Sequence, residues 1–71
     1  MKKYLIIIEK TETGYSAYVP DLPGCIATGK TKSIVEKNIY DAIQFHMEGL
    51  KELHLPIPTN KTEAGSIFIH V

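Results

Sequence analysis

One long amphipathic helix is the feature that most limits what this chain can fold into. Apolar side chains recur over residues 32–54 at steps of 4, 3, 1, 3, 4 and 3, which places them on one stripe of a helix of about six turns. Thr31 is a suitable N-cap, and Pro56 and Pro58 end the helix. The few segments outside the helix must cover this stripe, which consists of Val35, Ile39, Ala42, Ile43, His46, Leu50 and Leu53.

The segments outside the helix have the composition of short β-strands. Residues 3–9 are apolar on both faces, residues 15–19 alternate, and residues 25–28 and 66–71 are rich in β-branched side chains. The order β-β-β-α-β predicts an α+β fold, in which a four-stranded mixed sheet carries the helix on one face. The fourth strand is expected to lie parallel to the first through a right-handed crossover. A chain of 71 residues forms one domain at most, so we expect a single domain over 1–71.

Composition excludes several classes of protein. Eight basic residues balance eight acidic ones, whereas a nucleic-acid-binding protein usually has a basic surface. The single cysteine, Cys25, excludes an internal disulfide and a cysteine-based zinc site. The longest apolar run, Leu5-Ile6-Ile7-Ile8, is too short for a membrane span, and the start of the chain lacks the pattern of a signal peptide. We therefore expect a cytoplasmic protein without a membrane segment.

Residues 24–31, GCIATGKT, match the phosphate-binding pattern G-x-x-x-x-G-K-[ST]. Their surroundings disagree with that function. The preceding stretch Pro20-Asp21-Leu22-Pro23 is a poor buried strand because proline cannot donate a ladder hydrogen bond, and the residues between the two glycines are strand-like rather than a compact anion-binding loop. We predict a turn at Gly24, a strand end at Gly29, a helix cap at Thr31, and no nucleotide or other cofactor.

A larger pattern contains the same residues and resembles the HicB-like antitoxin family. It runs through Tyr18-Val19-Pro20-Asp21-Leu22-Pro23-Gly24-Cys25, then Gly29-x-Thr31, then Asn38, Ala42-Ile43 and His46, and ends with Pro56-x-Pro58. The resemblance extends over essentially the whole chain. It implies a partial ribonuclease H-like fold without catalysis. Within it, structural roles are implied for Pro20, Asp21, Leu22, Pro23, Gly24, Gly29 and Thr31.

The chain departs from the family pattern at several points. Ser33 and Ile34 occupy positions where members often have acidic residues, and Val35 replaces a small residue. Many members continue into a helix-turn-helix or ribbon-helix-helix domain that binds operator DNA, whereas this sequence stops at Val71. We therefore expect no specific DNA binding by this chain alone.

The resemblance implies a function through protein binding. In toxin–antitoxin pairs, such a domain binds a small basic toxin that cleaves messenger RNA and blocks its histidine-containing surface. The chain is thus expected to be an antitoxin for a HicA-type toxin; the alternative is a stand-alone oligomeric binding module with no toxin partner. The acidic residues that could face a basic partner are Glu9, Glu12, Asp21, Asp41, Glu48, Glu52 and Glu63, and the sequence does not select among them.

The sequence shows no catalytic set of residues. A ribonuclease H-type nuclease needs several carboxylates that converge on magnesium ions, but the opening strand has only Glu9 at its end, Asp21 lies in a proline turn, and Asp41 lies on the polar flank of the helix. His46 falls in the apolar stripe, where a structural role is expected, and no histidine pair has metal-ligand spacing. We predict neither enzymatic activity nor a metal site.

Self-association is expected because one helix leaves the second face of the sheet uncovered. The terminal stretch 67–71 also has little protection against pairing with another strand. Ile34 and Phe45 lie three turns apart on a line outside the apolar stripe. We predict a homodimer, or a tetramer built from two dimers, with Ile34, Phe45 and Phe68 as candidate interface residues.

Overall fold

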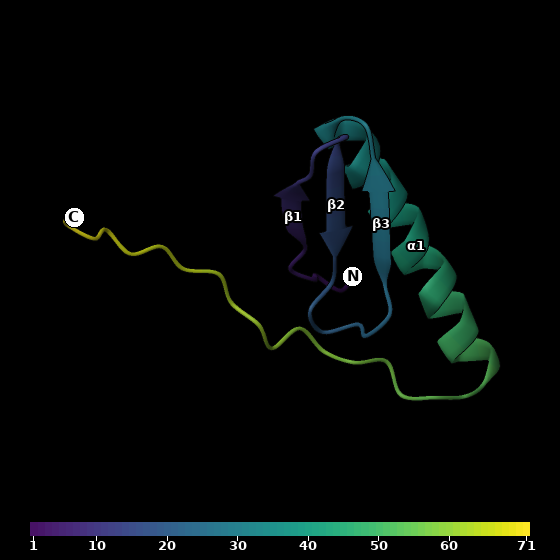
Figure 1. Ribbon diagram of the computed structural model, residues 1–71. Coiled ribbons are helices and arrows are strands. Elements are labelled where there is room, and N and C mark those ends of the chain that lie inside the picture. Colours follow the sequence, from purple (N-terminus) through teal and green to yellow (C-terminus); the bar gives the residue numbers. More distant parts are fainter.

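The computed structural model describes all of residues 1–71, and a three-stranded sheet with one helix forms its folded body (Figure 1). The elements in chain order are β1 (Ile7–Lys10), β2 (Tyr15–Tyr18), β3 (Ile26–Gly29) and α1 (Lys32–Glu52). The strands are antiparallel in the order β1-β2-β3, and α1 packs on one face of the sheet, mainly against β3 and β2. The α+β class and the order of the first four elements match the sequence prediction.

The sheet differs from the prediction in its last strand. Residues 66–71 were expected to form a fourth strand parallel to the first, but they run away from the folded body as an extended segment without regular structure (Figure 1). A strand exists only where a neighbour accepts and donates its backbone hydrogen bonds, and this segment has no neighbour within the chain. The sheet of the single chain is therefore three-stranded and purely antiparallel, not four-stranded and mixed.

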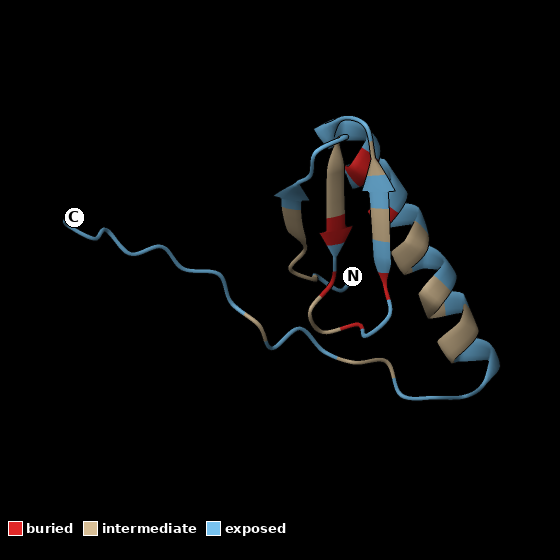
Figure 2. Ribbon diagram, viewed as in Figure 1, coloured by how far each residue is buried: buried red, intermediate tan, exposed pale blue.

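The hydrophobic core lies between α1 and the sheet (Figure 2). The alternation predicted for the second strand is present, because Ala17 and Val19 are buried and Tyr15 packs against the same cluster. Each strand side chain that faces α1 alternates with one that faces away. The buried residues are Ala17, Val19, Leu22, Cys25, Val35 and Ile39.

Most of the helix side chains that enter the core come from the first half of α1. Val35 and Ile39 are buried, and Ala42, Ile43 and Met47 pack partly against the cluster. Burial therefore decreases along α1, and its last turns add no fully buried residue (Figure 2). Of the other residues predicted for the stripe, His46 and Leu50 are half-buried and Leu53 is 69% exposed.

Both ends of α1 are capped close to the predicted positions. The Thr31 hydroxyl accepts a hydrogen bond from the Ile34 amide at 3.2 Å, which satisfies one of the free amides of the first turn. At the other end, the amide of Leu53 donates to the Gly49 carbonyl, and His54 adopts a left-handed conformation with φ of 54°. No helix combines the length and the apolar character needed to cross a membrane.

The segment after α1 returns to the sheet before it leaves the body. The Tyr4 hydroxyl donates a hydrogen bond to the Pro58 carbonyl. The Leu5 amide donates to the Asn60 side-chain oxygen at 2.9 Å. Residues 58–60 are thereby held beside the residues that lead into β1, although they form no strand.

Candidate functional site

The stretch GCIATGKT, residues 24–31, spans a turn, a strand and a helix cap. Gly24 has a φ of +84° and lies in the turn, and Ile26–Gly29 form β3. Thr31 is the N-cap of α1. Because successive residues of a strand point in opposite directions, the amides of β3 cannot converge on a phosphate group as those of a phosphate-binding loop do. The geometry therefore gives the stretch a structural role.

Gly29 is needed at the junction of β3 and α1. A Cβ atom at this position would lie 2.7 Å from the backbone nitrogen of Val35 and 2.9 Å from the side chain of Ile34. The glycine thus allows the strand to approach the first turn of the helix more closely than a side chain would permit.

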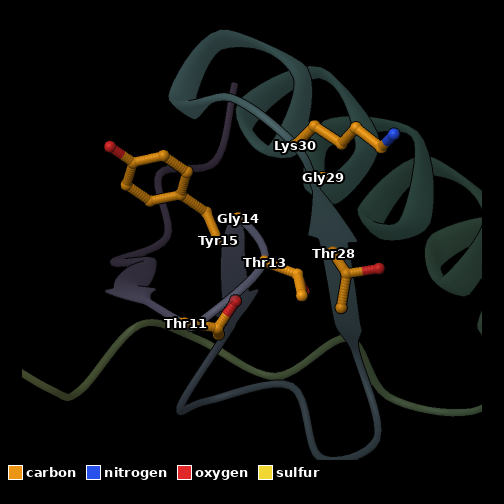
Figure 3. A pocket seen from close by; sticks show the side chains of 7 residues that line it. All are labelled: Thr11, Thr13, Gly14, Tyr15, Thr28, Gly29 and Lys30. Atoms are coloured by element: carbon orange, nitrogen blue, oxygen red, sulfur yellow. The ribbon is translucent and has the colours of Figure 1, made fainter.

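A shallow polar hollow of about 300 Å³ lies beside this junction, lined by Thr11, Thr13, Gly14, Tyr15, Thr28, Gly29 and Lys30 (Figure 3). Its polar groups point in different directions: the amine of Lys30 extends away from the hydroxyl of Thr11 (Figure 3). The lining contains no carboxylate, imidazole or thiol. The hollow therefore offers neither a general base nor a set of donors that converges on one ligand.

The proline turn between β2 and β3 places one apolar side chain in the core. Hydrogen bonds from the Val19 amide to the Cys25 carbonyl at 3.2 Å, and from the Leu22 amide to the Val19 carbonyl at 3.1 Å, close the turn. Leu22 is completely buried within it. Pro20 is half-buried, whereas Pro23 is exposed.

Asp21, in the same turn, binds a segment that follows forty residues later. Its carboxylate accepts hydrogen bonds from the amides of Lys61 and Thr62 at 2.8 and 2.9 Å and from the Thr62 hydroxyl at 3.1 Å. The bonds from the Thr62 and Lys61 amides favour the charged form and lower the pKa of Asp21 below its ordinary value. The sequence interpretation placed Asp21 in a proline turn and missed this contact, since no nearby residue indicates so distant a partner.

The other groups considered for catalysis are dispersed. Glu9 is exposed on β1, and Asp41 forms an ion pair with Lys37 at 2.8 Å, which raises the pKa of that lysine. Burial raises the pKa of the Cys25 thiol, which makes it a poor nucleophile. No group of three or more histidine, cysteine, aspartate or glutamate side chains is placed to hold a metal ion.

The exposed side of α1 carries a line of residues with a distinct character, which we call the outer stripe: Ile34, Asp41, Phe45, Glu48 and Glu52, all exposed. Steps of 7, 4, 3 and 4 residues keep them within about 40° of one line along the helix. Phe45 is 79% exposed and Ile34 is 45% exposed. The predicted pair Ile34 and Phe45 thus lies in water on a surface that also contains three carboxylates.

A second exposed apolar surface lies on the sheet face opposite α1. The strand register pairs Ile7 with Tyr18 and Tyr18 with Ile26, so these three side chains form a row across the sheet. Tyr18 is 43% exposed and Ile26 is 63% exposed. The sequence interpretation expected this face to be uncovered but did not identify the row, because the row depends on the register between strands.

Comparison with known sequences places the chain in a protein family. The model of a family described as "HicB_like antitoxin of bacterial toxin-antitoxin system" matches residues 4–67. A UPF0150 protein of Thermoplasma acidophilum is 45% identical over 62 residues, which cover 86% of this chain and 90% of that protein. An uncharacterized 14.9 kDa protein of Haemophilus phage HP1 is 49% identical over 49 residues, which cover 69% of this chain. The match spans only 37% of the phage protein.

Solved structures show the same likeness. A chain of the HicA3 and HicB3 toxin-antitoxin complex matches with a TM-score of 0.71 and 35% identity, over 84% of this chain and 70% of that one. The crystal structure of the antitoxin HicB3 gives the same TM-score and identity, over 84% of this chain and 44% of HicB3.

Proposed function

Because this chain belongs to the HicB-like antitoxin family of bacterial toxin–antitoxin systems, we propose that it binds and neutralises a small RNA-cleaving toxin of the HicA type, without catalytic activity of its own. The main support is the likeness to HicB3, at 35% identity over 84% of this chain, together with the complex of HicB3 with HicA3. The cytoplasm, where messenger RNA is translated, is the compartment in which such a pair acts.

The outer stripe of α1 is the surface that we assign to the toxin. Phe45 is a large, exposed side chain that a partner can desolvate, as aromatic anchors do in many interfaces. Glu48 and Glu52 add negative charge beside it, while Asp41 is paired with Lys37. The two glutamates attract a basic partner and accelerate association. A non-enzymatic chain can neutralise a nuclease in this way by covering its active surface.

The apolar row of Ile7, which is half-buried, with the exposed Tyr18 and Ile26 supports self-association as a second property. We propose a homodimer, or a tetramer formed by two dimers. The same surface would serve a stand-alone oligomeric module if no toxin partner exists. Specific DNA binding is not proposed for this chain, whose net charge is zero; sequence-dependent retardation of operator DNA by the purified chain would contradict this.

Inhibition of a toxin tests the proposed function directly. The purified chain is titrated into a HicA-type toxin with an RNA substrate present, and we expect RNA cleavage to stop near a stoichiometric ratio. Phe45→Ala should weaken the complex by about tenfold or more. A double change, Glu48→Lys with Glu52→Lys, should weaken it most at low salt, because salt screens exposed charges.

Glu12→Lys is the matched control, since Glu12 is an exposed carboxylate on the β1–β2 turn, outside the outer stripe. Failure of the unaltered chain to bind or inhibit the toxin would contradict the proposed function. If Phe45→Ala and the Glu48→Lys, Glu52→Lys double variant still neutralise the toxin fully, the proposed function stands but the outer stripe is not the toxin-binding surface. Magnesium-dependent RNA cleavage by the chain alone would contradict its non-enzymatic character.

A further inference from the structure

The C-terminal segment, residues 66–71, leaves a large amount of apolar surface in water. It contains no Asp, Glu, Lys or Arg. Ile67, Phe68, Ile69 and Val71 are 85%, 103%, 75% and 112% exposed, and the segment extends away from the folded body (Figure 1). Its β-branched and aromatic side chains suit a strand that is covered on both faces. The segment therefore has the composition of an internal strand and the surroundings of a free tail.

The chain reaches β1 before this segment begins. The Asn60 side-chain oxygen accepts a hydrogen bond from the Leu5 amide, and the Asp21 carboxylate accepts one from the Thr62 amide. Glu63 and Ala64 border the same hollow as Leu5 and Ile6. A Cβ atom on Gly65 would meet nothing within 4 Å, and the chain then continues away from β1 (Figure 1). The segment is thus carried to the outer side of β1 and passes beyond it.

The two edges of the sheet are protected to different degrees. At the β3 edge, the Asn38 side chain donates a hydrogen bond to the Thr28 carbonyl at 2.8 Å, and α1 packs alongside. At the β1 edge, Ile7–Lys10 pair with β2 only. Ile7 and Ile8 lie on opposite faces of β1, and both are only half-buried. A further strand beside β1 would satisfy its backbone groups and cover apolar side chains on both faces.

We propose that the C-terminal segment of one copy of this chain adds as a fourth strand to the open β1 edge of a second copy, and that the exchange is reciprocal. Because each copy supplies one segment and one β1 edge, two copies form a closed symmetric dimer in which both segments and both β1 edges are paired. Ile67, Ile69 and Val71 then cover one face of the sheet beside β1, and Phe68 and His70 lie on the other.

The area involved is sufficient for a stable dimer. Each segment contributes four large apolar side chains that are now exposed. Burying both segments removes on the order of 1,000 Å² from water, which is where specific interfaces begin. The inference rests on the self-association proposed above and does not depend on the toxin.

The mass of the protein in solution tests the exchange. By light scattering at high micromolar concentration, the unaltered chain should have twice the monomer mass, and Phe68→Asp should have the monomer mass. Circular dichroism should be the same for both at low concentration, because the Phe68 side chain contacts nothing in the single chain. Phe45→Asp, an equal change at an exposed residue of α1, should remain a dimer and fail to bind the toxin.

Cross-linking between two variants that each carry one added cysteine shows which chain receives the segment. Lys10→Cys on β1 and His70→Cys in the C-terminal segment are mixed and treated with a bismaleimide, while the buried native Cys25 stays protected. We expect a cross-linked product with one chain of each kind. A monomeric unaltered chain, a dimer that persists in Phe68→Asp, or cross-links confined within single chains of a variant that carries both Lys10→Cys and His70→Cys would each overturn the exchange. Loss of toxin binding alone would leave it intact.

Discussion

The proline turn and the C-terminal segment both lack regular structure and both contain large apolar side chains, yet their environments are opposite. Leu22 in the turn is fully buried, whereas Phe68 in the segment is fully exposed. The turn closes on itself through the Val19–Cys25 backbone bond and inserts Leu22 between α1 and the sheet. The C-terminal segment, residues 66–71, makes no side-chain hydrogen bond and no turn or loop backbone hydrogen bond to the rest of its chain. The comparison teaches that the turn is stabilised by contacts within one chain, whereas the apolar side chains of the segment are exposed in the single chain.

Leu22→Ala should have the largest effect on stability. Removal of a fully buried leucine side chain leaves a cavity and lowers the free energy of unfolding by about 2–5 kcal/mol. Urea unfolding monitored by circular dichroism measures this loss. Leu53→Ala is the control, because Leu53 is 69% exposed and should change stability far less. Equal losses in the two variants would contradict the structural role of the turn.

Phe68→Ala should act in a different way, through association. If the segment is covered only in the dimer, the unaltered protein gains stability as its concentration rises, by up to about 2.7 kcal/mol at a hundred times the dissociation constant. The variant should lose this dependence and keep the stability of the dilute protein. Melting temperatures across a concentration series measure it; a dependence that survives the change would assign association to another surface.

Thr31→Ala should cost about 0.5–2 kcal/mol, since the first turn of α1 loses the acceptor for the Ile34 amide. The effect should be independent of protein concentration, as for Leu22. Thr31→Asp keeps an acceptor at the cap and adds a negative charge near the helix N-terminus, where the first turn of α1 has no acidic residue. It should therefore restore stability. A deficit equal to that of Thr31→Ala would mean that the lost stability does not come from the missing side-chain acceptor.

The smallest effect is expected at Asp21, which joins the turn to residues 61 and 62. Its pKa in the folded chain is lower than the ordinary value of 3.8, so its charged form stabilises the fold above that value, and the contribution disappears as pH falls through the lowered pKa. The difference in melting temperature between the unaltered chain and Asp21→Asn should therefore shrink as pH falls below 3.8 and through the lowered pKa.

Trypsin cleavage after Lys61 provides a second measurement of the Asp21 contact. At neutral pH it should be faster in Asp21→Asn, because the amides of Lys61 and Thr62 lose their charged acceptor. Glu12→Gln, at an exposed carboxylate with no such partners, is the matched control. A cleavage rate in Asp21→Asn equal to that of the unaltered chain would show that the contact does not hold the segment.

Local features of the sequence determined the parts of the molecule whose interactions are local. The stripe of apolar residues and the cap at Thr31 placed the helix close to its observed bounds, Lys32–Glu52, because helical periodicity and capping involve residues three or four positions apart. Alternation and turn residues located the second and third strands to within one residue at each end, whereas the first strand was predicted over 3–9 and spans Ile7–Lys10. The pattern GCIATGKT could be separated from a phosphate-binding loop because proline precedes it and β-branched residues lie within it.

The tertiary structure alone decided the features that join distant parts of the chain. The contact of Asp21 with Thr62, the row Ile7, Tyr18 and Ile26, and the packing of Met47 against the core depend on strand register and on where α1 crosses the sheet. The C-terminal segment shows the difference most clearly. Its composition predicts a strand, but a strand forms only where a free sheet edge lies within reach. Only the tertiary structure decides whether that edge is the β1 edge of the same copy or that of a second copy.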